Sequence, residues 1–178
     1  MDHRLSKTTL FLHWMIAINV IGLLIVGLIM HENKIYSLYP IHKSVGMLIL
    51  PLALFRVYWR IKEKWPAPIH QLSQKWIRLS HISHISLLSL TLLMPITGML
   101  MSIFSGRGLS LFSVPLIMAQ QNSEGEFIEL SKTWAEITHQ MHFLFSDMLL
   151  FILSAHITAA LIHHFFLKDN VLRRMFRI

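Results

Sequence analysis

Four long stretches of largely apolar sequence limit what this chain can fold into. They cover about residues 9–30, 41–60, 81–104 and 139–167. Each is near the length that an α-helix needs to cross the hydrocarbon core of a bilayer, roughly 20 residues. Such segments span a membrane as helices, because a helix satisfies its backbone polar groups internally. The sequence therefore predicts an all-α membrane protein, a single domain of 178 residues built as a four-helix transmembrane bundle.

The composition supports this prediction. Hydrophobic residues make up 54% of the chain and charged residues 14%, whereas a typical soluble domain has roughly 45–50% and 25%. A soluble protein of this size could not bury so much apolar surface, so we expect lipid around the bundle. The chain has no Cys, which excludes disulfides, thiolate metal sites and thioether attachment of a haem.

Basic residues gather at one side of the predicted bundle. Most of the 16 Lys and Arg residues fall at the N-terminus, between the second and third helices, and at the C-terminus. Cytoplasmic loops carry such an excess, so we expect both termini to be cytoplasmic. The net charge of +7 then reflects topology and does not indicate a nucleic-acid partner. The residues on this side are Arg4, Lys7, Arg56, Arg60, Lys62, Lys64, Lys75, Arg78, Lys168, Arg173, Arg174 and Arg177.

Four of the 12 histidines fall at matched depths. His142 and His156 are 14 residues apart, close to four helical turns and roughly 21 Å of rise, so one face of the fourth helix carries a histidine at each of two depths. His42 matches the depth of His142, and His13 matches that of His156. A bis-histidine haem needs one imidazole on each side of its plane, usually from two helices. The spacing therefore predicts two haems, with iron ligands His42/His142 and His13/His156.

Three further residues lie where they would serve these haems. Arg56 follows His42 by 14 residues and so repeats its face at the inner depth, and Arg60 lies one turn further. An arginine there can pair with a haem propionate. Gly46, one turn after His42, would leave room for the outer macrocycle. The alternatives are a topology signal for the arginines and close helix packing for the glycine.

A group of polar residues lies near the cytoplasmic boundary. His163 is two turns past His156 on the same stripe, and its imidazole suits a quinone partner because it exchanges protons near neutral pH. His84 and Lys75 are further candidates, and an interfacial role is the alternative for all three. Asp147 lies between the two haem depths, where we expect its carboxyl group to be protonated or hydrogen-bonded to another helix.

Several of these segments resemble the bacterial cytochrome b561 family, which is related to the cytochrome b subunits of nickel hydrogenases and formate dehydrogenase. The resemblance covers essentially the whole chain. Its pieces are Leu12-His13-Trp14, residues 41–46 with Arg56 and Arg60, residues 95–98, and the C-terminal series of His142, His156, His163-His164 and Lys168-Asp169-Asn170.

The resemblance implies a four-helix protein of the bacterial inner membrane with two b haems that exchanges electrons with ubiquinone. Its ligand positions carry over to His13, His42, His142 and His156. His139 remains a competitor of His142 as the outer ligand. The quinone-side histidine of the family carries over to His163. Some members are similar to a superoxide oxidase.

We therefore expect electron transfer between a periplasmic donor, with superoxide as one candidate, and ubiquinone. Lys34, Lys43, Arg107 and Lys132 could steer an anion at the outer side, although five acidic residues there weaken the field. One alternative is a membrane cytochrome b subunit of a dehydrogenase or hydrogenase, with a soluble redox partner. A second alternative is a histidine-lined transporter of divalent metal ions.

Overall fold

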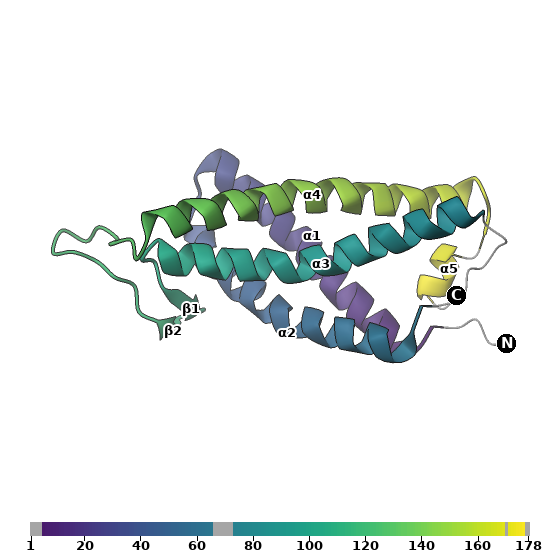
Figure 1. Cartoon of the computed structure of the whole chain (residues 1–178), viewed down its shortest axis with the longest axis horizontal. Coiled ribbons are helices and arrows are strands. Elements are labelled where there is room, and N and C mark those ends of the chain that lie inside the picture. The colour runs from purple at the N-terminus through teal and green to yellow at the C-terminus, as the bar shows by residue number, and fades with distance from the viewer. Residues whose placement is uncertain (1–4, 66–72, 170, 177–178) are drawn as a thin grey trace.

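The computed structural model describes residues 5–65, 73–169 and 171–176. Four long helices run side by side along the molecule (Figure 1). A small hairpin lies at one end, and the start of the first helix and the C-terminal helix lie at the other. The elements are α1 (Lys7–Asn33), η1 (Tyr36–Leu38), α2 (Tyr39–Glu63), α3 (Gln74–Phe104), β1 (Leu109–Leu111), β2 (Val114–Ile117), α4 (Lys132–Phe165) and α5 (Val171–Phe176).

Each of the four long helices is long and apolar enough to cross a membrane, which confirms the prediction of a four-helix bundle. Large apolar side chains point outward along them. The side chains of Phe11, Ile18 and Phe151 are 61%, 65% and 76% exposed, as expected for a surface that faces lipid.

Two helices begin a full two turns before the apolar sequence does. α3 starts at Gln74 and α4 at Lys132, whereas the apolar stretches start at residues 81 and 139. Polar residues extend a helix beyond the bilayer without interrupting its backbone hydrogen bonds, so hydropathy marks only the apolar part. Lys75 and Arg78 therefore lie on α3, within what the sequence suggested was a connection. Arg4 and Arg177 lie outside the described residues.

The centre of the bundle is aliphatic. α2 packs against α1 and α3, and α4 packs most extensively against α3. Pro51 and Pro95 lie inside α2 and α3, and both helices continue through them, as membrane helices commonly do. The buried cluster is Ile16, Val20, Leu24, Ile49, Ala53, Leu90 and Leu149.

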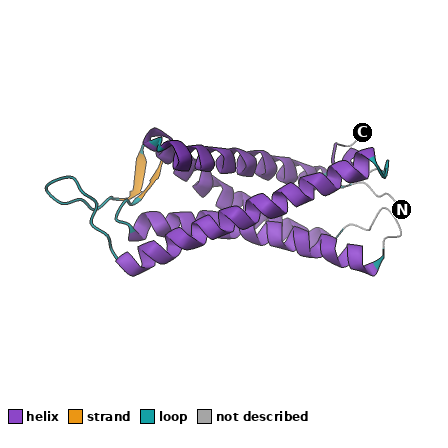
Figure 2. Cartoon of the chain, turned by 90° about the horizontal axis from the view of Figure 1, so that it is seen from above, coloured by secondary structure: helices purple, strands orange, loops and turns teal. Residues whose placement is uncertain are grey.

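The β1–β2 hairpin adds strand structure that the sequence did not predict (Figure 2). It begins after Gly106 and Gly108, whose φ angles are +73° and +61°. A Cβ atom at Gly106 would lie 2.0 Å from the Ile128 carbonyl oxygen, so only glycine fits. Ser44, with no exposed surface, holds the hairpin to α2 because its hydroxyl accepts a 2.6 Å hydrogen bond from the Phe112 amide. The expectation of an all-α chain was therefore wrong in this one segment.

Candidate functional site

Two of the predicted ligands come together near the hairpin. His42 on α2 and His142 on α4 lie close enough for their charges to interact. The His142 Nδ1 atom is 3.1 Å from the Met94 carbonyl oxygen and 3.1 Å from the Thr97 hydroxyl. A carbonyl only accepts, so Nδ1 carries the hydrogen and Nε2 keeps a free lone pair. This is the orientation that metal-binding histidines commonly have. We call His42, His142, Met94 and Thr97 the hairpin-end cluster.

Glycines shape the space around this cluster. A Cβ atom at Gly98 would lie 3.0 Å from the His142 Cε1 atom, and one at Gly27 would lie 3.5 Å from the His42 Cε1 atom. Gly98 therefore makes room for the His142 ring, whereas a Cβ atom at Gly27 would make only an ordinary van der Waals contact with the His42 ring. A Cβ atom at Gly46 would meet nothing within 4 Å, so this glycine faces open space, as expected beside a flat cofactor.

The other predicted residues meet at the opposite end of the bundle. Arg56, Arg60, His84 and His156 all lie close enough to His13 for their charges to interact. Every long helix contributes to this terminal-end cluster, which consists of these five residues and Trp65. The structure thus places the two histidine pairs at two depths of the bundle.

Three contacts in the terminal-end cluster were not predicted from the sequence. The rings of His84 and His156 meet edge to face, with centroids 5.2 Å apart. Trp65 lies 5.9 Å from His84, and the Arg60 guanidinium lies over the Trp65 ring at 5.4 Å. His84 therefore belongs with the inner ligand pair. Trp65 had no distinguishing sequence signal, because it follows α2 in a polar stretch.

The residues present fit b-type haem. The buried Nδ1 atoms of His13 and His42 have no hydrogen-bond partner among the described residues. An unsatisfied buried polar atom costs about 1–3 kcal/mol. The protein by itself therefore leaves one ring nitrogen of each of these histidines at this cost. Imidazoles paired from different helices, an open glycine and two arginines are the donors and the space that an iron porphyrin with carboxylate side groups requires.

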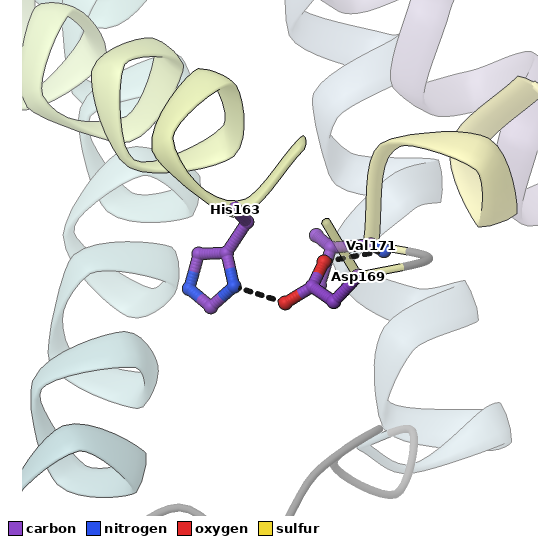
Figure 3. Close-up of polar contacts among 3 residues, drawn as sticks. All are labelled: His163, Asp169 and Val171. Atoms are coloured by element: carbon purple, nitrogen blue, oxygen red, sulfur yellow. Dashed lines mark hydrogen bonds and ion pairs between the residues drawn. The ribbon is translucent and has the colours of Figure 1, made fainter. Parts of the chain in front are cut away.

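His163 is held by a carboxylate at the end of α4 (Figure 3). Its Nδ1 atom is hydrogen-bonded to Asp169, whose side chain is 1% exposed. The other carboxylate oxygen of Asp169 accepts a 3.0 Å hydrogen bond from the Val171 amide. The Nε2 edge of the ring points away from Asp169. Among the described residues, no hydrogen bond, ion pair or ring contact joins His163 to His84 or to Lys75, which is exposed on α3.

The structure also shows where two other candidate residues, His139 and Asp147, lie. His139 is exposed and its ring packs on Phe143 at 4.7 Å, whereas His142 points to α3 and the interior. Asp147 is exposed, and the hydrogen bond expected for it is not formed within the described part of the chain. The expectation of a hydrogen bond to another helix was therefore wrong, because Asp147 faces away from the other helices.

Cations also lie beside His42. The Lys43 ammonium group donates a 3.0 Å hydrogen bond to the Ser102 hydroxyl, which in turn donates to the Gly108 carbonyl at 2.6 Å. Arg107 lies close enough to Lys43 for their charges to interact. Lys34 and Lys132 are exposed at the ends of α1 and α4. Lys43 and Arg107, two of the four cations predicted to steer an anion, therefore lie close to each other.

Comparison with known proteins decides the family. The sequence pattern of the prokaryotic cytochrome b561 family matches residues 4–177. The chain belongs to this family. Membership implies b-type haem and electron transport by a multi-pass bacterial membrane protein.

Three relatives illustrate the similarity. The chain is 28% identical to cytochrome b561 homolog 2 of Escherichia coli (strain K12) over 92% of its own length and 86% of the relative. It is 26% identical to cytochrome b561 homolog 1 of the same organism over 97% of both chains. It is 33% identical to the probable superoxide oxidase CybB of Yersinia pestis over 76% of its length and 72% of the relative.

Proposed function

We propose that this cytochrome moves electrons across the bacterial inner membrane between a periplasmic donor and ubiquinone, through two b haems. The observation that carries the proposal is the separation of the histidines into two clusters at opposite ends of one bundle. A single cofactor site would not account for both pairs.

His42 and His142 would hold one iron and His13 and His156 the other. When bound, each haem iron supplies a centre that accepts and releases one electron. The Met94 carbonyl and Thr97 keep the His142 ring turned so that Nε2 faces the site. Arg56 and Arg60 supply positive charge for propionates at the terminal end. Gly46 would leave space for the hairpin-end haem, because a Cβ atom there would meet nothing within 4 Å.

The terminal end, which carries α5, is proposed to be cytoplasmic. Lys62, Lys64, Lys75 and Arg78 lie at this end, on the last turns of α2 and the first turns of α3 or just beyond. The positive-inside rule places such loops in the cytoplasm. The hairpin-end cluster then faces the periplasm.

Superoxide is the donor that we favour. The similarity to a probable superoxide oxidase supports it, as does the pair of cations, Lys43 and Arg107, beside His42. The exposed residues Glu124, Glu126 and Glu129 oppose a strong positive field at this end. A superoxide pulse should decay faster with the quinone-loaded protein than in buffer; equal decay would remove superoxide as the donor.

His163 is our candidate contact for the quinone head group. The Asp169 hydrogen bond leaves its Nε2 atom available, and the ring lies two turns from His156. His84 would act differently, because it contacts His156 directly. Lys75 has only its position at the same end to support it.

Haem stoichiometry and the reduced visible spectrum test the proposal. The purified protein should contain two b haems per chain, and His142→Ala and His156→Ala should each lose about one. His139→Ala is the matched control and should keep both, because its ring is exposed. A colourless protein, or two haems retained in both ligand variants, contradicts the assignment.

The alternatives are less well supported. A subunit of a dehydrogenase or hydrogenase would keep the haems and add a soluble partner, so co-purification of a flavin or metal subunit would favour it. A metal transporter has no site to support it within residues 5–65, 73–169 and 171–176, where no three His, Asp or Glu side chains are arranged so that they could hold one metal ion together.

A further inference from the structure

The side of α4 opposite His142 and His156 carries an acidic residue near the middle of the helix. Asp147 is nine residues from His156 and so lies about 180° away around the helix, at roughly 100° per residue. It is exposed near the middle of the 34-residue helix. The described part of the chain gives it no hydrogen bond or ion pair. A carboxyl group at this depth is costly without a partner, so the isolated chain leaves it unsatisfied.

Further polar residues share this side of α4. Gln140, Asp147 and Ser154 are spaced by seven residues, and Thr158 lies one turn beyond Ser154. Together with apolar residues they form a seam with alternating spacings of four and three, which is the pattern of two helices packed as a left-handed pair. All members are exposed. The α4 seam is Gln140, Leu144, Asp147, Phe151, Ser154, Thr158, Leu161 and Phe165.

The other helices of the bundle do not cover the α4 seam. The buried residues of α4 are Ala135, Thr138 and Leu149, which lie on the histidine side. On the seam, Phe151 is 76% exposed and Phe165 64%. A lipid chain covers such apolar groups well, but it has no hydrogen-bonding group at mid-span for Asp147.

We propose that a second copy of this chain packs along the α4 seam, with α4 parallel to α4 and Asp147 beside the same residue of the other copy. Two copies inserted in the same direction are related by a twofold axis along the membrane normal. Such an interface is self-complementary, so equal residues meet at equal depth.

The chemistry of the seam suits pairing with itself. Amide and hydroxyl groups both donate and accept hydrogen bonds, and so does a protonated carboxyl group. Gln140, Ser154 and Thr158 can therefore each bond to their own counterpart, and two Asp147 side chains can share one proton. The seam contains no cation, and three of its four polar residues have no need of a charged partner. A second copy satisfies all four.

Disulfide cross-linking tests this contact, because the natural chain has no Cys. Phe151→Cys and Ser154→Cys, each in the full haem-loaded chain in native membranes, should form covalent dimers under mild oxidation. Ile18→Cys on α1 and Leu54→Cys on α2 are matched controls, since these residues are 65% and 54% exposed elsewhere on the bundle. Equal cross-linking in the controls, or no dimer at positions 151 and 154, overturns the proposal.

Substitution of the acid separates self-association from other partners. Asp147→Asn can still pair with itself and should keep the dimer, whereas Asp147→Leu should weaken it about tenfold, as expected for loss of one interhelical hydrogen bond. Light scattering in detergent measures the mass, and the haem spectrum reports folding. Unchanged mass for Asp147→Leu, or a cross-link to a different membrane protein, overturns the proposal.

Discussion

At the scale of single residues, the His142 ring is held on two sides near the proposed hairpin-end haem. Its ring is fixed by the Met94 carbonyl and Thr97 on one edge, and Gly98 lies against its Cε1 atom. A ring held on two sides has little freedom to absorb an added atom, because packed interiors adjust by only small amounts.

We expect Gly98→Ala to loosen the hairpin-end haem. The added methyl group would lie 3.0 Å from the His142 Cε1 atom, so the ring must shift away from its hydrogen bonds. Gly22→Ala is the matched control, since its methyl group would meet nothing within 4 Å. The haem content and the temperature at which the Soret band is lost on heating should both fall for Gly98→Ala and stay unchanged for Gly22→Ala. Identical behaviour of the two variants would show that the His142 ring is not constrained there.

Asp169 offers a second prediction at this scale, which rests on the proposed quinone role of His163. Asp169→Asn keeps an oxygen for the Val171 amide, but its NH₂ group would face Nδ1. The ring then accepts at Nδ1 and carries its hydrogen on Nε2, the opposite tautomer. Electron transfer to ubiquinone should slow by about a hundredfold, in the range of general acid–base effects.

The controls for Asp169 separate chemistry from folding. α5 is also attached to α1, because the Trp14 indole donates a 3.0 Å hydrogen bond to the Met175 carbonyl. Haem spectra and reduction by dithionite should therefore stay unchanged in Asp169→Asn, while the pH profile of quinone reduction shifts. An unaltered pH profile would mean that Asp169 only holds the start of α5 in place and has no part in quinone reduction. Loss of haem reduction itself would instead count against the electron path.

Residues differed in how far the sequence could predict their surroundings. The 14-residue spacing of His142 and His156 fixed their common face, because helical geometry is regular. The Asp169 contact with His163 and the Trp65 contact with His84 depend on chain turns after a helix ends. No periodicity describes such turns, so these partners could not be predicted from spacing.

At the scale of elements, Ser44 connects the hairpin to the helices. Its hydroxyl donates to the Pro40 carbonyl and accepts from the Phe112 amide, both at 2.6 Å. Ser44 is also two residues from His42, so the same turn of α2 carries a proposed ligand and the attachment of the hairpin.

Ser44→Ala should release the hairpin from α2. The Phe112 amide would lose its acceptor, at a cost of about 1–3 kcal/mol. Hydrogen–deuterium exchange of residues 109–117 should become faster, and Ser89→Ala, at an exposed position of α3, should leave it unchanged. Slow exchange retained in Ser44→Ala would mean that the β-ladder alone holds the hairpin.

The helices were predictable as elements and the hairpin was not. Apolar length determines where a chain crosses a bilayer, so four helices followed from the sequence. Their outer turns did not, since residues 74–80 and 132–138 are polar enough to resemble loops. The strands have three and four residues, too short for an alternating pattern to distinguish them from any apolar loop.

At the scale of the whole molecule, orientation decides the direction in which the proposed electron path runs. The basic residues at the terminal end predict that this end is cytoplasmic. The chain without Cys allows a direct test with single cysteines at the two ends. Met118, which follows β2, is 74% exposed, and Ser73, just before α3, is also exposed.

Met118→Cys should react with a membrane-impermeant maleimide in intact spheroplasts, whereas Ser73→Cys should react only after the membrane is permeabilised. Neither substitution changes the charge that sets topology, and neither position belongs to a histidine cluster. The reverse labelling pattern would place the His42/His142 cluster on the cytoplasmic side. A periplasmic donor would then have to reach His13 and His156 first, and the proposed order of donor, hairpin-end haem, terminal-end haem and quinone would be excluded.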